Sequence, residues 1–424
     1  MTHRFQTILG NDIKPEALET FKVNHQSLEG IQPRTILDPI ETLSPQDVRA
    51  QIDGSLDCLI GGPPCEGFSQ NRTINGIGTR THKLIDDPRN HLFKWFVRLA
   101  GELQPKIVLI ENVPDLVRHR DGETREEIIS ALDAAGYRSS VRVLNAADFG
   151  VPQLRRRAFF VGQRKSDFSE TGITFEFPHP THLPYPLQHA SLLEDSSWLP
   201  GDSGYWVSVR EAIGDLPLPT EHDNFDHGTA RYPNEQQTMF RSMMRMQKGI
   251  PFNHLARRLG PGGLTRIQAI KPGQRCAELP DNLRPKAHYH YSYTRLSWSE
   301  PARTITKFAY HVGSGQFAHP VEDRAVTMRE AARLQSFPDS FQFVGTNEIR
   351  KISALVGSAV PPLLGKVLGQ KIAQYLDRLA VRRLRPDLRH EVKEVNGDAV
   401  LRRLQTEEWG SERQQAKQIS FLER

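Results

Sequence analysis

The sequence predicts an α/β fold with a doubly wound, mostly parallel sheet, joined to a second, smaller domain rich in loops and short strands. Three observations predict it. Short apolar segments alternate with helical patterns over the first 165 residues. The periodicity is then lost between residues 165 and 295, where Pro, Gly, His and aromatic residues dominate, and regular helical patterns return towards the C-terminus.

The strands of the sheet are expected where apolar residues stand together, at 5–9, 57–60, 106–110, 141–144 and 158–162. Helices are expected at 15–24, 123–135, 327–336 and 363–379. The first of these helices has Pro15 in its first turn, and the second is followed by Gly136, a residue that commonly ends a helix. Chemistry in such a sheet gathers where the strands reach their carboxyl ends.

These patterns divide the chain into three parts. Residues 1–165 and 350–385 are expected to form the domain built around the sheet, and residues 166–349 the second domain. Residues 386–424 are densely charged and are expected to form a C-terminal extension. At roughly 150 residues per domain, a chain of 424 residues has room for two to three domains.

The composition excludes several classes of protein. Hydrophobic residues make up 38% of the chain and charged residues 25%, which excludes wholesale disorder, collagen and a coiled coil. Three Cys are too few for a disulfide framework, and no apolar run approaches the ~20 residues of a membrane-spanning helix. We therefore expect a cytoplasmic protein without a membrane partner.

Cys65 follows a predicted strand in the segment GGPPC (61–65). A Cys in such a turn, at the carboxyl end of a strand, can be surrounded by backbone N–H dipoles that favour its thiolate. The alternative, which this residue alone favours, is a small buried Cys that packs the turn. Cys58 and Cys276 have no comparable setting and are expected to be packing residues.

Polar groups accompany two further predicted strands. Glu111 ends one of them, where a carboxylate loses hydration unless it has a partner or a task. Gln153, Arg155 and Arg157 alternate at the start of the next, which predicts that an amide and two guanidinium groups point to one face. An exposed strand-end Glu and an edge strand with hydrated arginines are the alternatives that these residues leave open.

Taken together, these segments resemble a known family. GGPPCEGFS (61–69), ENV (111–113), LNAADFGVPQ (144–153), QLRRR (153–157), RLSWSEPARTIT (295–306), REAARLQSFPD (329–339) and GSAVPP (357–362) occur in the order and spacing seen in C5-cytosine DNA methyltransferases. The resemblance spans most of residues 5–375 outside the variable middle. It implies a Rossmann-like methyltransferase domain that uses S-adenosyl-L-methionine, a target-recognition domain and no metal.

The resemblance also implies a role for each polar side chain. The thiolate of Cys65 would attack C6 of a cytosine, Glu111 would hold the ring at N3 and its amine, and Arg157 would donate to O2, with Arg155 supporting the pocket or a phosphate. The activated C5 would then take the methyl group. Because a stacked base is out of reach, the cytosine must be flipped out. The polar loop 70–87 would close as a lid, with a plain surface loop as the alternative.

Donor contacts are implied at the ends of the early strands and in two later segments. The implied residues are Asp12, Ile13, Asp38, Pro63, Leu92, Ser358 and Val360. Asp12 matches the family's acidic residue that binds the ribose hydroxyls of the donor. Ser358 stands where the family usually has Asn or Asp.

The chain departs from the family near its start. The family opens with a strand and a Gly-rich loop, F-x-G-x-G, that approaches the methionine part of the donor. No such motif occurs in the first 50 residues or in the C-terminal tail. We therefore expect the chain to be about one strand and one loop short, and to bind the donor weakly or not at all. A non-catalytic DNA-binding remnant is the second hypothesis, against which the retained Cys65, Glu111, Arg155 and Arg157 speak.

Positive charge is concentrated in one segment of the chain. Between Glu235 and Glu278 there are eight Lys and Arg and no acidic residue, a net charge of +8 against +5 for the whole chain. The family reads its target in this variable region, so phosphate and base contacts are expected there, with a hydrated basic face as the alternative. The residues expected to contact DNA are Gln70, Arg72, Gln153, Arg241, Arg245, Arg257, Arg258 and Arg266.

The expected partner is double-stranded DNA, which the chain would methylate as a monomer. The resemblance fits a restriction–modification methylase, with a cognate endonuclease acting on the same site, or a solitary enzyme. RNA methylation by the same chemistry is a third hypothesis. The segment HYHYSY (288–293) is expected as a strand with alternating aromatic residues, because its spacing lacks the Cys or carboxylate partners of a metal site.

Overall fold

The computed structural model describes residues 4–25, 32–52, 54–64, 73–74, 92–184, 204–219, 232, 238–245, 251–271, 274–286 and 288–384. Cys65, Gln70 and Arg72 lie outside the described residues, as do most of the loop 70–87 and the chain from residue 385 onwards.

The described part of the chain alternates strands and helices. Its strands are β1 (Leu9–Asn11), β2 (Arg34–Ile36), β3 (Cys58–Gly61), β4 (Thr73–Ile74), β5 (Ile107–Asn112), β6 (Tyr137–Asn145), β7 (Gln153–Leu154), β8 (Arg156–Arg164), β9 (His182–Leu183), β10 (Gly204–Tyr205), β11 (His288–Tyr289) and β12 (Ala302–Arg303). Its α-helices are α1 (Pro15–Asn24), α2 (Pro45–Arg49), α3 (Leu92–Leu103), α4 (Asp115–Arg118), α5 (Glu123–Ala134), α6 (Lys165–Thr171), α7 (Val209–Ile213), α8 (Met239–Met244), α9 (Pro261–Gln268), α10 (Met328–Leu334), α11 (Ile349–Ser358) and α12 (Pro362–Leu384).

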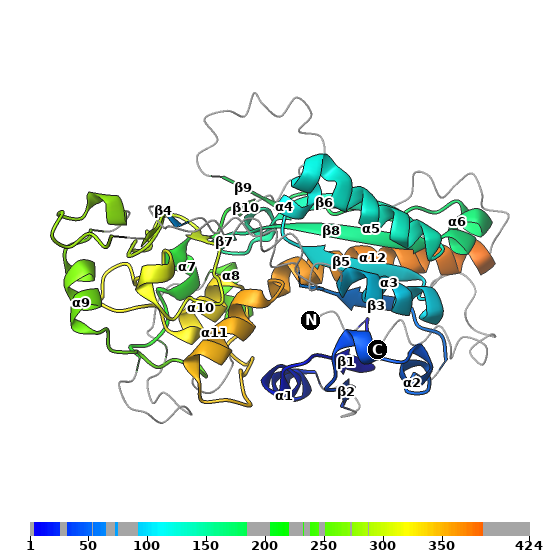
Figure 1. Ribbon diagram of the computed structural model, residues 1–424, viewed down its shortest axis with the longest axis horizontal. Coiled ribbons are helices and arrows are strands. Elements are labelled where there is room, and N and C mark those ends of the chain that lie inside the picture. The colour runs from blue at the N-terminus through cyan, green and yellow to red at the C-terminus, as the bar shows by residue number, and fades with distance from the viewer. Residues whose placement is uncertain are drawn as a thin grey trace.

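Four strands form the largest sheet, in the order β3-β5-β8-β6 (Figure 1). Strands β3 and β5 are parallel, and β8 runs antiparallel to both β5 and β6. It follows that β3, β5 and β6 share one direction and β8 is the exception. Strands β1 and β2 form a separate parallel pair. This confirms the mostly parallel α/β sheet predicted from the sequence.

Helices cover both faces of this sheet, as a doubly wound fold requires. Val108 and Ile110 of β5 pack with the apolar residues of α3 and α5 on one face. Ile107 and Leu109 of the same strand pack with those of α12 on the other. The alternation follows from the two-residue period of a strand, and both faces are buried, so the strand reads as a continuous apolar run.

Two predicted elements differ from the structure. Strand pairing begins at Leu9, opposite Arg34, so the strand predicted at 5–9 lies instead at Leu9–Asn11. Phe5 is 40% exposed, and the chain before the strand is held differently: Arg4 Nη2 donates to Asp377 of α12 at 2.6 Å. The predicted strand at 288–293 is also wrong beyond β11, because residues 290–293 form a turn.

A second core lies beside the sheet and contains α7, α8, α10 and α11 (Figure 1). Ile352 and Val356 of α11 belong to it, whereas Leu364 and Leu368 of α12 belong to the core of the sheet. The stretch Ile349–Leu384 is long and apolar enough to be compared with a membrane span, because an 18-residue window in it has a mean hydropathy of 1.4. Since α11 and α12 bury these side chains in two cores, we read the stretch as two core helices.

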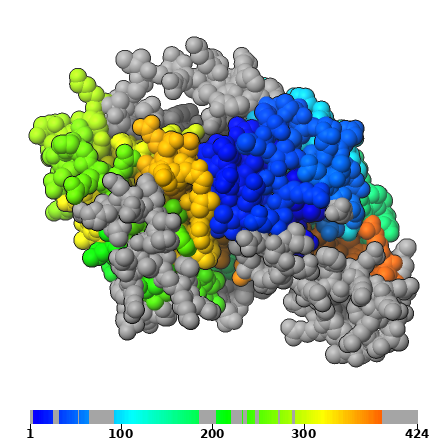
Figure 2. Space-filling view, turned by 90° about the horizontal axis from the view of Figure 1, so that it is seen from below, coloured from blue at the N-terminus to red at the C-terminus, as the bar shows by residue number. Residues whose placement is uncertain are grey.

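Helix α1 is fastened to the loop that precedes α11. Thr20 Oγ1 donates to the carbonyl oxygen of Val344 at 3.1 Å, and Asn24 Nδ2 donates to that of Gln342 at 2.8 Å. Figure 2 shows the N-terminal segment (blue) beside the orange segment of α11. These contacts connect the β1–β2 pair to the second core. The predicted division of the chain into domains stays a prediction.

Candidate active site

An ion pair marks the carboxyl end of β5. Arg157 Nε, on β8, lies 2.9 Å from Glu111 Oε1, and each side chain is only 15% exposed. Burial raises the pKa of Glu111, and the neighbouring Arg157 and Arg155 oppose this shift only in part. The site therefore contains a carboxyl group that can hold a proton more readily than a hydrated Glu.

Two glycines let other groups approach the turn that leads to Cys65. A Cβ on Gly62 would lie 3.2 Å from Glu111 Oε2, and one on Gly61 would lie 2.4 Å from the ring of Phe96. Asn112 Nδ2 donates to the carbonyl oxygen of Pro63 at 3.2 Å, which ties this turn to the end of β5. The Gly-Gly-Pro-Pro segment is thus packed directly against the Glu111 carboxylate.

Arg155, predicted as a catalytic residue, is buried with only 1% of its surface exposed. Its guanidinium donates to the carbonyl oxygens of Ile305, Gly357 and Ala359 at 2.9, 2.9 and 3.1 Å. Burial, with repulsion from Arg157, lowers the pKa of Arg155 to about 9. The acceptors are backbone groups at Ile305, at the end of α11 and directly after it. The predicted catalytic role of Arg155 stays a prediction.

A cavity of about 480 Å³ opens beside this ion pair. It is bounded by the end of β1, the end of β3, the middle of β5 and β8, and the facing sides of α11 and α12. Among the residues predicted to bind the donor, Asp12, Ser358 and Val360 line it, and Glu111 lies at the same wall. The volume falls in the range of small-molecule sites, roughly 300–1,000 Å³.

The other predicted donor residues lie around this cavity rather than in its wall. Ile13 is 63% exposed, and Asp38 is also exposed, although its carbonyl oxygen accepts from Asn11 Nδ2 at 2.8 Å. Pro63 is buried next to Gly62, and Leu92 is the first residue of α3. Direct contact is therefore supported for Asp12, Ser358 and Val360 and not for Ile13 or Asp38.

The cavity lies where two strand edges come together without pairing. Both carboxyl ends line it, through Asp12 after β1 and Gly62 after β3, and Leu9 and Leu59 share a small core at the other end. The two strands therefore point the same way. Among the described residues β1 pairs only with β2 and β3 only with β5, and Ile60 of β3 is 63% exposed. In the described part of the chain, an open edge of β3 therefore faces this side of the cavity.

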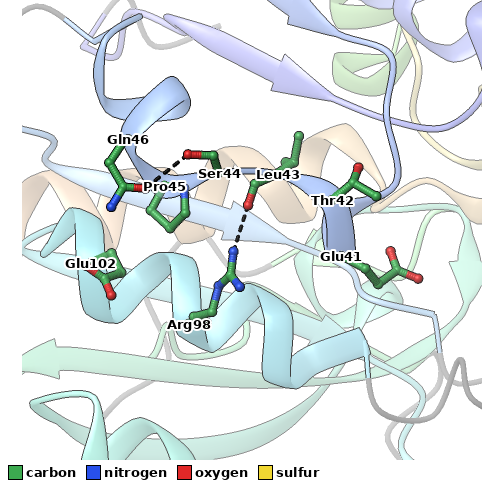
Figure 3. A pocket seen from close by; sticks show the side chains of 8 residues that line it. All are labelled: Glu41, Thr42, Leu43, Ser44, Pro45, Gln46, Arg98 and Glu102. Carbon is green, nitrogen blue, oxygen red and sulfur yellow. Dashed lines mark hydrogen bonds between the residues drawn. The ribbon is translucent and has the colours of Figure 1, made fainter.

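A second hollow, of about 470 Å³, lies between residues 41–46 and α3 (Figure 3). It is formed by 41–46 and by Arg98 and Glu102 of α3, and Arg98 Nη2 donates to the carbonyl oxygen of Leu43 at 2.8 Å. No residue predicted to act in catalysis or binding lines it.

Comparison with known proteins agrees with this geometry. The sequence profile of the family described as C-5 cytosine-specific DNA methylase matches residues 1–374. The type II methyltransferase M1.HphI of Haemophilus parahaemolyticus is 32% identical over 369 residues, which cover 87% of this chain and 81% of that protein. The type II methyltransferase M.DdeI of Desulfomicrobium norvegicum is 29% identical over 394 residues, or 88% and 85% of the two chains.

The chain belongs to the C-5 cytosine-specific DNA methylase family. A solved structure of a putative DNA modification methyltransferase, encoded within a prophage of E. coli, covers 89% of the methylase with a TM-score of 0.62 at 21% identity, and 95% of that chain is matched. At this identity the likeness shows the fold alone, and it is the fold that the sheet and its helices display.

Three residues of the methylase that were predicted to contact DNA are used inside the protein. Gln153 is fully buried: its amide donates to Leu334 O and Gln335 Oε1 and accepts from Ile305 N. Arg241 and Arg245 both pair with the buried Asp215, with Nε–Oδ distances of 3.7 and 2.6 Å. For these residues the geometry contradicts the prediction, because their polar atoms are committed to internal partners.

The other predicted DNA contacts lie at the surface. Arg257 and Arg258 are exposed, and Arg266 of α9 is half-buried, with donations to Leu283 O and Gly262 O. These three stay candidates for DNA binding.

The described cysteines confirm the packing role expected of them. Burial raises the pKa of Cys58 to about 12, and Cys276 is fully buried. A thiol with such a pKa is a poor nucleophile at neutral pH. In the part of the chain that the structure describes, no group of His, Cys, Asp and Glu could hold a metal ion.

Sequence reasoning missed two groups of residues at the site. The wall of the cavity includes Leu355, Leu368 and Gly369, whose helical spacing reads as ordinary core. Asn112 was noted only as part of the segment 111–113, yet it fixes the turn before Cys65. A polar residue directly after Glu111 in a strand buried on both faces was the available signal.

Proposed function

We propose that this methylase transfers the methyl group of S-adenosyl-L-methionine to C5 of a cytosine flipped out of duplex DNA, through a bond between Cys65 Sγ and C6. The observation that carries the proposal is the convergence at one sheet edge of the Glu111–Arg157 pair, the turn leading to Cys65 and the neighbouring cavity. Acid, nucleophile and donor are needed within reach of a single base.

Glu111 is the proton donor of this scheme. Burial raises the pKa of its carboxyl group, so a flipped base that excludes further water favours the protonated form. The proton passes to N3 of the cytosine while the Cys65 thiolate forms the S–C6 bond, which leaves an enamine with a nucleophilic C5. Arg157, already 2.9 Å from Glu111, is placed to donate to O2 of the same ring.

The methyl donor supplies an electrophilic methyl group to C5. Loss of the C5 proton to water, return of the N3 proton to Glu111 and cleavage of the S–C6 bond then restore the Cys65 thiolate and release 5-methylcytosine. The cavity fits the donor in two respects: Asp12 offers a carboxylate at the rim for hydroxyl groups, and the apolar wall of Ile60, Phe159 and Leu368 suits a flat ring. Ser358 and Val360 would border it.

Donor affinity is where the proposal is most specific to this chain. Among the described residues, β1 pairs with β2 and β3 pairs with β5, so no strand fills the side of the cavity between β1 and β3. We infer that the donor binds weakly. Isothermal titration calorimetry of the methylase beside M1.HphI tests this, and an equal affinity for the two proteins would contradict it.

The transfer itself is tested with donor carrying a deuterated methyl group. The methylase is incubated at high donor concentration with duplex DNA and, separately, with transfer RNA, and the nucleosides are then analysed by mass spectrometry. We expect labelled 5-methyldeoxycytidine from DNA, none from RNA and none with Cys65→Ser. Label in RNA alone would reject duplex DNA as the substrate, and label with Cys65→Ser would reject the covalent step.

The setting of the enzyme is proposed from its relatives. M1.HphI and M.DdeI are named type II methyltransferases, the class that accompanies restriction endonucleases. We propose the same role for this methylase, acting as a monomer in the cytoplasm.

A further inference from the structure

Two arginines of the methylase lie over one tyrosine ring. The Arg303 guanidinium carbon is 3.9 Å from the centroid of the Tyr291 ring, and that of Arg275 is 5.5 Å from the same centroid. Arg275 Nη1 also donates to His290 Nε2 at 3.0 Å, and the His290 ring meets Tyr291 edge to face. We call Arg275, Tyr291 and Arg303 the arginine–tyrosine stack.

The stack holds positive charge that the described residues do not neutralise. Both arginines are exposed, and neither guanidinium forms an ion pair with a described carboxylate. The Glu278 carboxylate lies nearby, where Oε1 accepts from the backbone N of Arg275 at 3.0 Å. An exposed cation–π contact contributes only about 0.5–1 kcal/mol, so the ring orients the guanidinium groups without cancelling their charge. Two adjacent, oriented and uncompensated cations fit an anionic partner.

The turn that presents Tyr291 is built rigidly. Residues 290–293 form this turn, and Tyr293 takes a φ of 56°, a left-handed conformation that is rare for a bulky side chain. Tyr293 N donates to Val312 O at 2.7 Å, and Ser292 Oγ donates to Gly313 O at 2.6 Å. Strain of this kind persists only where surrounding contacts fix it, and it concentrates at functional sites.

Strand pairing places the stack between the candidate active site and the loop after Cys65. Arg303 of β12 pairs with Leu154 of β7, one residue before Arg155. On the other side, β11 pairs antiparallel with β4, so that Tyr289 lies opposite Thr73. This placement puts the stack near the path that we infer for a DNA strand presenting a flipped base to Glu111.

We propose that the arginine–tyrosine stack binds two phosphates of the DNA strand beside the target cytosine. This inference rests on the proposed function. The planar guanidinium suits a phosphate because it can donate two parallel hydrogen bonds to one group. The stack differs from Arg241 and Arg245, which both form ion pairs with Asp215.

The test is fluorescence anisotropy of a labelled, mixed-sequence DNA duplex bound to the full chain over a series of salt concentrations. Arg275→Ala and Arg303→Ala should each weaken binding about tenfold and lower the slope of log affinity against log salt by about one. Tyr291→Leu should weaken binding with the slope kept, because the cations remain but lose their orientation. Tyr291→Phe should bind like the parent, since the ring is retained.

Arg138→Ala is the matched control. Arg138 is also exposed and lies 4.3 Å over a ring, that of Phe168, but it stands at the opposite end of β6 from the site. Arg303→Lys keeps the positive charge but loses the two parallel N–H donors of the guanidinium. The slope of log affinity against log salt should therefore be unchanged, whereas the affinity for DNA should fall. Thermal melts confirm that each variant is folded.

The outcomes separate the stack from the function on which it rests. If the parent binds duplex DNA and the two alanine variants match it in affinity and slope, the stack is refuted and the proposed function stands. An equal loss in Arg138→Ala would also refute it. If the parent does not bind duplex DNA at all, the proposed function fails and the stack fails with it.

Discussion

The core of the sheet and the second core differ in how they hold charge. Strands β5 and β8 pack apolar side chains on both faces, and the charged residues of the candidate site come where these strands reach the sheet edge. The second core instead surrounds whole ion pairs. Arg333 is fully buried and lies 3.0 Å from Asp215 and 2.5 Å from Asp339, and Arg324 lies 2.7 Å from Glu330.

This difference teaches how to read an arginine in this chain. The basic segment 236–277 suggests a uniform DNA-binding surface, yet its arginines fall into two sets. Arg241 and Arg245 have the carboxylate of Asp215 within reach and serve the second core. Arg275 stacks on Tyr291 without a described carboxylate partner and stays available to an anion. The local supply of carboxylates decides the role, and the net charge does not.

The largest expected effect comes from breaking a buried ion pair in the second core. Arg333→Met leaves Asp215 and Asp339 with less compensation, and we expect the free energy of unfolding to fall by about 3–5 kcal/mol. Arg303→Met, at the surface, should change it by less than about 0.5 kcal/mol. Urea unfolding of both variants checks the contrast, which equal losses would contradict.

Acid should weaken the second core through Glu330. Burial alone would raise the pKa of Glu330, but Arg324 outweighs it and lowers the pKa to about 2. A carboxyl whose pKa is depressed on folding stabilises the protein above its unfolded pKa, near 4.5, and loses this contribution as the pH falls towards 2. The loss amounts to about 3 kcal/mol.

Glu330→Gln checks this pH dependence. The variant is less stable at neutral pH, but its unfolding free energy should change less between pH 4.5 and 2 than that of the parent. Parallel curves for the two proteins in urea unfolding over this range would show that Glu330 is not the titrating group.

A smaller effect on the free energy of unfolding is expected for Arg245, which the sequence predicts to contact DNA. Arg245→Gln removes the 2.6 Å contact with Asp215 and should lower the unfolding free energy by about 2 kcal/mol. Since the side chain is committed to that carboxylate, the salt dependence of DNA binding should stay unchanged. A slope lowered by one, as expected for Arg275→Ala, would move Arg245 to the DNA-binding set.

The smallest effect is expected at the sheet edge. Gly62→Ala places a Cβ 3.2 Å from Glu111 Oε2, which must shift by a few tenths of an ångström. Stability should barely change, whereas formation of the bond between Cys65 and DNA should slow about tenfold because the acid is displaced. Gly260→Ala is the matched control, because a Cβ at this position would have no heavy atom within 4 Å. Equal rates would show that Glu111 tolerates displacement.

The sequence predicts the sheet well because its signals are local. The apolar runs of β5 and β8 are buried as expected, and Pro15 marks the start of α1. Strand β3 is only partly buried, because Ile60 is 63% exposed. The direction of β8 could also have been predicted from the sequence. Only residues 146–155 separate β8 from β6, and this segment is too short for a crossover helix, so the two strands must be antiparallel.

The partners of Gln153 and Arg155 lie beyond local reasoning. Their hydrogen bonds reach Ile305, Leu334 and Gly357, between 150 and 202 residues along the chain. The alternation in sequence predicts that the two side chains lie on one face. Only the folded chain shows that both donate to backbone carbonyl oxygens of the protein. The two-residue strands of the second region are too short to leave a period.

The central claim is that Cys65 attacks a cytosine held by Glu111, and it can be tested without the methyl donor. Duplexes of random sequence in which pyrimidin-2-one replaces cytosine present a C6 that accepts a thiolate directly. We predict a protein–DNA band that survives denaturing electrophoresis and is absent with Cys65→Ser. No such band, under conditions where anisotropy shows the same duplexes bound, would contradict the account.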